Sequence, residues 1–169
     1  MAARVVLFGY GNPSRGDDAL GPALLACTMV WLAEHPEVDV RIVEDFQLQV
    51  EHALDLAEAD LALFVDADAT APSPFQLRRA MPARDGSYTT HELTPESVLY
   101  AARKVSGGEP PPAWVLGVRG EQFELGDPLS DRAKAHLDAA WEELRVLLAD
   151  PRAAAWDARC VVHQRNFPA

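Results

Sequence analysis

The stretch from Val5 to Gly21 constrains the fold of this chain more than any other segment. It opens with an apolar run, Val5 to Phe8, whose β-branched residues are typical of a short buried strand. A glycine-rich loop follows and ends in two adjacent aspartates, Asp17 and Asp18. Apolar residues at helical spacing come directly after them, and the N-terminus of a helix favours negative side chains. We therefore predict a strand over residues 4–8 and a helix over 18–34.

Strands and helices alternate along the rest of the chain. We expect further strands at 38–43, 61–65, 88–90 and 113–118, and helices at 48–59, 94–105 and 130–149. Residues 71–85 carry three prolines and are expected to form a loop or an edge strand. This alternation predicts an α/β fold: a single three-layer domain with an open, mostly parallel twisted sheet of about five strands and helices on both faces, similar to phosphorylase and hydrolase folds.

Composition excludes several classes of protein. The chain has 169 residues, enough for one domain with a full core, and we assign 1–150 to an α/β domain that would carry the functional site and 151–169 to a tail without clear periodicity. The formal net charge of −11 argues against nucleic acid as a partner. No apolar run is long enough to cross a membrane, and the N-terminal residues do not read as a signal peptide. We expect a cytoplasmic protein.

Acidic and imidazole side chains follow three of the expected strands. Asp17 and Asp18 follow the first strand, Asp66 and Asp68 end the apolar strand at 61–65, and His91 follows the strand at 88–90. In open α/β sheets the ligand site lies at the carboxyl ends of the strands. The topology therefore brings these groups toward one edge of the sheet.

Several chemistries fit such a site. Nucleotide binding is disfavoured, because Ser14 stands at the third position of a GxGxxG fingerprint and two aspartates occupy the helix start. Nucleophilic hydrolysis has little support, since no GxSxG elbow is present. An aspartate pair that shares a proton is also conceivable. Two carboxylates and an imidazole can hold a borderline divalent ion such as nickel, zinc, iron or manganese, yet each residue also has an ordinary structural explanation.

Three segments together resemble the nickel–iron hydrogenase maturation endopeptidases. Residues 9–12 (GYGN) followed by 16–21 (GDDALG) are similar to the family's turn and the start of its first helix. Residues 64–67 (FVDA) resemble its strand that ends in Asp-Ala. Residues 90–96 (THELTPE) resemble its histidine segment, most closely in the branch that serves bidirectional, NAD-linked hydrogenases.

The resemblance implies an endopeptidase that removes the C-terminal extension from the nickel-loaded precursor of a hydrogenase large subunit. Family members are expected to recognise nickel already held by the substrate rather than to carry a permanent metal. Carried over by motif, the catalytic and nickel-recognising residues are Asp18, Asp66 and His91. Gly9, Gly11, Asn12 and Asp17 would shape the supporting turn. A chaperone that binds the precursor or its metal without cutting is the alternative.

The remaining candidates are given structural roles. Asp68 is a second choice beside Asp66 and is expected to be a solvated loop acid. His52 and His136 are expected to be exposed on helices. Cys27 is expected in the core, and Cys160 and His163 in an irregular tail that packs on the core.

Overall fold

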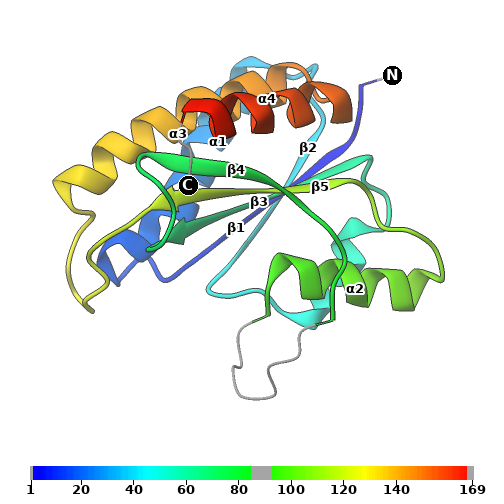
Figure 1. The fold of residues 1–169 in the computed structure, drawn as a ribbon, viewed down its shortest axis with the longest axis horizontal. Coiled ribbons are helices and arrows are strands. Elements are labelled where there is room, and N and C mark those ends of the chain that lie inside the picture. The colour runs from blue at the N-terminus through cyan, green and yellow to red at the C-terminus, as the bar shows by residue number, and fades with distance from the viewer. Residues whose placement is uncertain (1, 85–92, 167–169) are drawn as a thin grey trace.

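The computed structural model describes residues 2–84 and 93–166 and contains one five-stranded sheet (Figure 1). The strand order is β2-β1-β3-β5-β4. β1, β2, β3 and β5 run parallel, whereas β4 pairs antiparallel with β5 at one edge. The strands span Val5–Tyr10 (β1), Val40–Asp45 (β2), Leu61–Asp68 (β3), Phe75–Ala80 (β4) and Ala113–Arg119 (β5).

Helices cover both faces of the sheet, as Figure 1 shows. One face carries α1 (Leu20–Glu34), α3 (Asp131–Ala149) and α4 (Ala153–Asn166). The other carries α2 (Pro95–Ser106) and the 3₁₀ helix η2 (Val50–Leu56). A second 3₁₀ helix, η1 (Gly16–Ala19), leads into α1. The predicted three-layer α/β domain with a mostly parallel sheet is confirmed.

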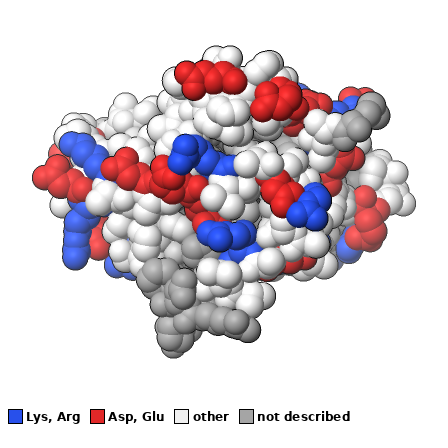
Figure 2. Space-filling view, turned by 90° about the horizontal axis from the view of Figure 1, so that it is seen from above, with Lys and Arg blue, Asp and Glu red and all other residues white. Residues whose placement is uncertain are grey.

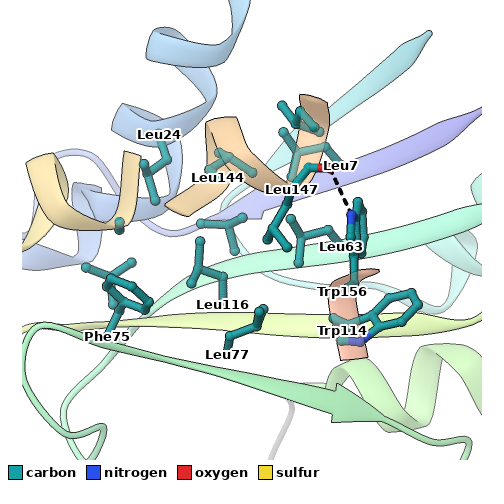
Figure 3. Close-up of a cluster of buried hydrophobic side chains, with 14 of the residues drawn as sticks. Leu7, Leu24, Leu63, Phe75, Leu77, Trp114, Leu116, Leu144, Leu147 and Trp156 are labelled. Carbon is teal, nitrogen blue, oxygen red and sulfur yellow. Dashed lines mark hydrogen bonds between the residues drawn. The ribbon is translucent and has the colours of Figure 1, made fainter. Parts of the chain in front are cut away.

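The larger core lies between the sheet and α1, α3 and α4. Alternate residues of β1, β3 and β5, such as Leu7, Leu63 and Trp114, point to this side, as the two-residue period of a strand requires. Figure 3 shows them meeting Leu144 and Leu147 of α3 and Trp156 of α4. The intervening residues form a second core with α2 and η2, in which Phe8 and Phe64 stack with ring centroids 4.6 Å apart.

Capping residues set where two helices begin. Thr94 accepts a hydrogen bond from the N–H of Ser97 at the start of α2, and Pro95 occupies its first turn. Ser130 caps α3 by accepting from the N–H of Ala133. Both starts fall where the sequence pattern predicted them.

Three expectations about local structure need correction or completion. The helix expected at 48–59 is the shorter 3₁₀ helix η2. The tail expected to be irregular forms α4, which buries Trp156 and Cys160 against the larger core. Residues 71–85 were expected to form a loop or an edge strand, and they contain the edge strand β4. The strand expected at 88–90 lies outside the described residues.

Charge is mixed over the surface despite the acidic excess. Figure 2 shows acidic and basic side chains interspersed with uncharged ones on the face seen there. None of the helices that the structure describes is both long and apolar enough to cross a membrane.

Candidate active site

The candidate site lies at the carboxyl end of the central strand β3 and of its neighbour β1. These strands are parallel neighbours, and their register pairs Gly9 with Val65. The next residue on each strand is Tyr10 on β1 and Asp66 on β3, so these two residues lie at the same level of the sheet edge. Asp66 lies two residues after Phe64 and therefore faces the α2 side of the sheet.

Two glycines let the first loop and helix fold tightly over this edge. Gly11 has φ +143°, and a Cβ there would lie 2.1 Å from the carbonyl oxygen of Asp18. A Cβ at Gly21 would lie 2.4 Å from the carbonyl oxygen of Tyr10 and 3.1 Å from that of Val65. The start of α1 therefore rests directly on the ends of β1 and β3, and it brings Asp18 to the edge that carries Asp66.

Asp18 is half-buried and is oriented by the turn before it. Its Oδ2 accepts the backbone N–H of Asn12 at 2.6 Å. Asn12 in turn accepts the N–H of Ser14 through its side chain, at 2.9 Å, and that of Arg15 through its carbonyl oxygen, at 3.0 Å. A carboxylate has about four acceptor positions, so this hydrogen bond leaves the group able to bind a cation.

Asp17 is fully buried and fastens the loop to the segment between β5 and α3. Its carboxylate accepts the backbone N–H groups of Glu121, Gln122 and Ser130 at 2.8, 3.0 and 2.8 Å, and the Ser130 hydroxyl at 3.0 Å. Burial acts to raise the pKa of Asp17, but the hydrogen bonds from Glu121, Ser130 and Gln122 outweigh it and lower the pKa below its usual value. Asp17 thus stays ionised inside the protein.

Tyr10 stands beside Asp66 and was not singled out by the sequence analysis. Burial, followed by the negative charges of Asp66 and Glu96, raises the pKa of the Tyr10 phenol well above its ordinary value. Its hydroxyl remains protonated and can act as a hydrogen-bond donor at this edge. The sequence does indicate its position: Tyr10 lies two residues after Phe8, so it faces the same side of the sheet at the end of the same buried strand. Arg78 of β4 and Glu96 of α2 form an ion pair next to it.

Asp68 folds back on its own turn instead of standing free in a solvated loop. It is the last residue of β3 and is half-buried. Its Oδ1 accepts the N–H and hydroxyl of Thr70, each at 2.8 Å, and the N–H of Ala71 at 3.1 Å. Asp68 is therefore less solvated than expected, although its hydrogen bonds to Thr70 are exposed, and its contacts give it a turn-forming role.

The third predicted site residue, His91, lies outside the described residues, so its position relative to Asp18 and Asp66 stays a prediction. Among the side chains that the structure does describe, no three His, Cys, Asp or Glu residues are grouped so as to bind a metal ion. The structure thus brings the Asp18 loop and Asp66 to one edge, and the proposed set of three remains a hypothesis.

The expectation of exposed histidines on the helices is wrong for two residues. His52 is buried beneath Phe8, accepts the N–H of Gln49 at 2.9 Å through Nδ1, and places Nε2 3.3 Å from Asp45. His136 is buried between α3 and the end of β5, where it bonds to the carbonyl oxygen of Arg119. Sequence periodicity missed both. His136 is held by the carbonyl of Arg119, which is distant in the sequence, and His52 takes part in the N-terminal cap of η2.

Several solved structures with this architecture are hydrogenase maturation proteases. The hydrogenase maturation protease HycI from Thermococcus kodakarensis KOD1 is 25% identical, with TM-score 0.64 over 88% of this chain and 94% of its own. The maturating endopeptidase HybD from E. coli is 22% identical, with TM-score 0.65 over 88% and 93%. The hydrogenase 2 maturation peptidase of a Thaumarchaeota archaeon is 22% identical, with TM-score 0.57 over 83% and 95%.

The chain has the fold of the hydrogenase maturation proteases. The resemblance to the hydrogenase maturation proteases predicted from the sequence motifs is confirmed, and the likeness supports the prediction of an endopeptidase. The closer resemblance to the branch that serves NAD-linked hydrogenases stays a prediction. No family model matches the sequence, and no curated protein matches it either. The hydrogenase-protease fold is therefore recognised here through its architecture and through short motifs at the sheet edge.

Proposed function

We propose that this chain is a cytoplasmic endopeptidase that removes the C-terminal extension from the nickel-loaded precursor of a nickel–iron hydrogenase large subunit. The observation that carries the proposal is the meeting of the Asp18 loop with the end of β3, where Asp66 lies, on the scaffold of the hydrogenase maturation proteases. The similarity of residues 90–96 to the histidine segment favours a bidirectional, NAD-linked hydrogenase as the target.

The nickel is cargo of the substrate, and the proposed ligands are Asp18, Asp66 and His91. Two carboxylates and one imidazole leave coordination positions for the ligands that the precursor already supplies. A divalent ion shared in this way can polarise the scissile carbonyl or lower the pKa of a bound water, and either effect promotes peptide hydrolysis without a serine or cysteine nucleophile. We expect no permanent metal in the free protein.

The supporting residues hold this edge ready for the substrate. Asp17 ties the loop to the β5–α3 segment, and the Asn12 N–H orients the Asp18 carboxylate. The protonated hydroxyl of Tyr10 is available beside Asp66, where a donor can orient a carboxylate or the polarised carbonyl oxygen. Fixed groups of this kind reduce the reorganisation needed when the precursor binds.

The acidic charge of the chain bears on how the precursor is recognised. With a formal net charge of −11, the protein would bind most readily to a partner that presents basic surface near its extension. Binding should then weaken as ionic strength rises, because salt screens attraction between exposed charges.

The test is processing of a purified precursor. The nickel-loaded and nickel-free precursors are incubated with the protein, and the products are identified by mass spectrometry. We expect release of the C-terminal peptide only with nickel, and its loss with Asp18→Ala and with His91→Ala. Asp138→Ala is the matched control, because Asp138 is an exposed aspartate in the middle of α3. A nickel-loaded precursor that binds but stays intact would favour the non-cleaving chaperone instead.

A further inference from the structure

An exposed serine and a buried histidine meet at the start of β4, on the α3 side of the sheet. Ser73 lies in the loop between β3 and β4 and is exposed. His136 projects from α3 and is 9% exposed. The Ser73 Oγ lies 2.8 Å from His136 Nε2. The two residues come from segments 63 positions apart, so the fold and not the local sequence creates this pair.

The partner of the second ring nitrogen fixes the direction of this hydrogen bond. His136 Nδ1 lies 2.8 Å from the carbonyl oxygen of Arg119. A carbonyl oxygen can only accept, so Nδ1 carries the proton. In the neutral imidazole Nε2 then has a lone pair and no proton, and the Ser73 hydroxyl donates to it. A buried, oriented imidazole that accepts from an exposed hydroxyl is the arrangement that activates a serine nucleophile.

The surroundings hold the serine loop against the histidine. The Arg119 backbone N–H donates to the carbonyl of Pro74 at 3.0 Å, and its Nη1 donates to the carbonyl of Ala71 at 2.9 Å. Arg119 thus fastens the loop on both sides of Ser73 while its own carbonyl orients His136. Its guanidinium lies beside the loop, bonded to the Ala71 carbonyl and 3.8 Å from the Glu121 carboxylate.

We propose that Ser73 is a nucleophile activated by His136 and that it accepts acyl groups from activated esters. Ser73 Oγ forms a bond to the ester carbonyl carbon while its proton passes to His136 Nε2. The tetrahedral adduct then collapses, the bond to the alcohol breaks, and the leaving oxygen takes the proton from Nε2. The product is an acylated Ser73 with a neutral His136. None of the residues proposed for precursor processing takes part.

A fluorophosphonate carrying a fluorophore tests the proposal on the full chain. Oγ displaces fluoride from phosphorus, so a reactive serine gains a stable mass increment that peptide mapping can locate. Ser106 is the internal control, because it is exposed but its hydroxyl donates to the carbonyl of Gly108 instead of to an imidazole. We expect Ser73 to be labelled about 100-fold faster than Ser106, the scale of a positioned general base. Equal labelling of the two serines would overturn the proposal.

Two variants separate activation from packing. Ser73→Ala should remove the label and leave precursor processing unchanged. His136→Asn retains an N–H donor for the Arg119 carbonyl but offers no basic nitrogen to Ser73, so labelling should fall about 100-fold with the thermal midpoint little changed. Labelling of a folded His136→Asn variant at the wild-type rate would show that the contact is only structural. If this variant fails to fold, the labelling rates of Ser73 and Ser106 in the wild-type chain are compared again in guanidinium. The proposal requires that Ser73 no longer be labelled faster than Ser106 once the chain is unfolded.

Discussion

The carboxylate of Asp17 accepts two hydrogen bonds from Ser130, one from its backbone N–H at 2.8 Å and one from its hydroxyl at 3.0 Å. Ser130 also caps α3 through the N–H of Ala133. A buried charge at the start of the first helix thereby positions the start of another helix more than a hundred residues later in the chain. The two adjacent aspartates have divided roles: Asp17 joins the starts of α1 and α3 on one face of the sheet, and Asp18 lies at the sheet edge.

Asp17→Asn should destabilise the protein strongly. The amide keeps one acceptor oxygen but turns an NH₂ group toward N–H donors that now lack a partner, which costs about 2–3 kcal/mol of unfolding free energy in a buried site. Urea denaturation measures the change. Asp18→Asn is the matched control: Asp18 is half-buried and accepts a hydrogen bond from the Asn12 N–H, so its loss of stability should be below about 1 kcal/mol. Equal losses in the two variants would contradict this division of roles.

The contribution of Asp17 should depend on pH in one direction. Its pKa is lowered in the folded protein, so the folded state binds the proton more weakly than the unfolded chain does. The stabilisation is therefore complete above the unfolded pKa of about 3.9 and is lost as pH falls through the lower folded value. The stability difference between wild type and Asp17→Asn should stay constant from neutral pH to about pH 5 and shrink below about pH 4. A difference that grows in acid would refute the pKa direction.

Processing should distinguish the two aspartates of β3. Asp66→Asn removes a proposed nickel ligand and should reduce cleavage of the nickel-loaded precursor by at least about 100-fold, a usual effect for loss of a group that acts on the reacting centre. Asp68→Asn keeps the side-chain oxygen that accepts from Thr70 and Ala71, so its turn survives and cleavage should stay within about threefold of wild type. The reverse ranking would move the site to Asp68.

Much of the fold follows from sequence patterns that act locally. The strand at Leu61 to Val65 is apolar at every position because helices cover both faces of the sheet. Such a continuous apolar run is typical of a strand with parallel partners. The starts of α2 and α3 follow from Thr94 and Ser130, whose caps use neighbours three residues away. The position of Asp18 at this edge was also predictable, because the carboxyl ends of parallel strands lie at the same edge of a sheet.

The features that sequence reasoning missed depend on contacts between distant segments. α4 has no clear apolar period because it is anchored by a few residues: Trp156 enters the core, and Asp157 binds Arg79 of β4 and the indole N–H of Trp114. His136 likewise has a partner on another element, the carbonyl oxygen of Arg119 at the end of β5. Such partners cannot be read from spacing along one strand or helix.

Cys160 should be far less reactive than an ordinary thiol. Burial, and then the nearby charge of Asp157, raise the pKa of Cys160 to about 11. At pH 8 only about 0.1% of this thiol is ionised, compared with about a quarter of a free cysteine, and the thiolate is the reactive form. Modification by a disulfide reagent should be at least about 100-fold slower than in guanidinium, where both thiols react. Cys27→Ser isolates the signal of Cys160, and fast reaction in the folded state would contradict the docking of α4.

Substitution of Trp156 measures how much the packing of α4 on the core contributes to the free energy of unfolding. Its side chain is fully buried, packs edge-on against Trp114 with ring centroids 4.9 Å apart, and donates its indole N–H to the carbonyl of Leu147 at 2.8 Å. Trp156→Ala leaves a cavity in the larger core and should lower the free energy of unfolding by about 3–5 kcal/mol. Val161→Ala is the control on the same helix, because Val161 is 47% exposed and should change stability by less than about 0.5 kcal/mol. Equal, small effects of the two changes would mean that α4 contributes little to the core, and residues 153–166 would then be dispensable for folding.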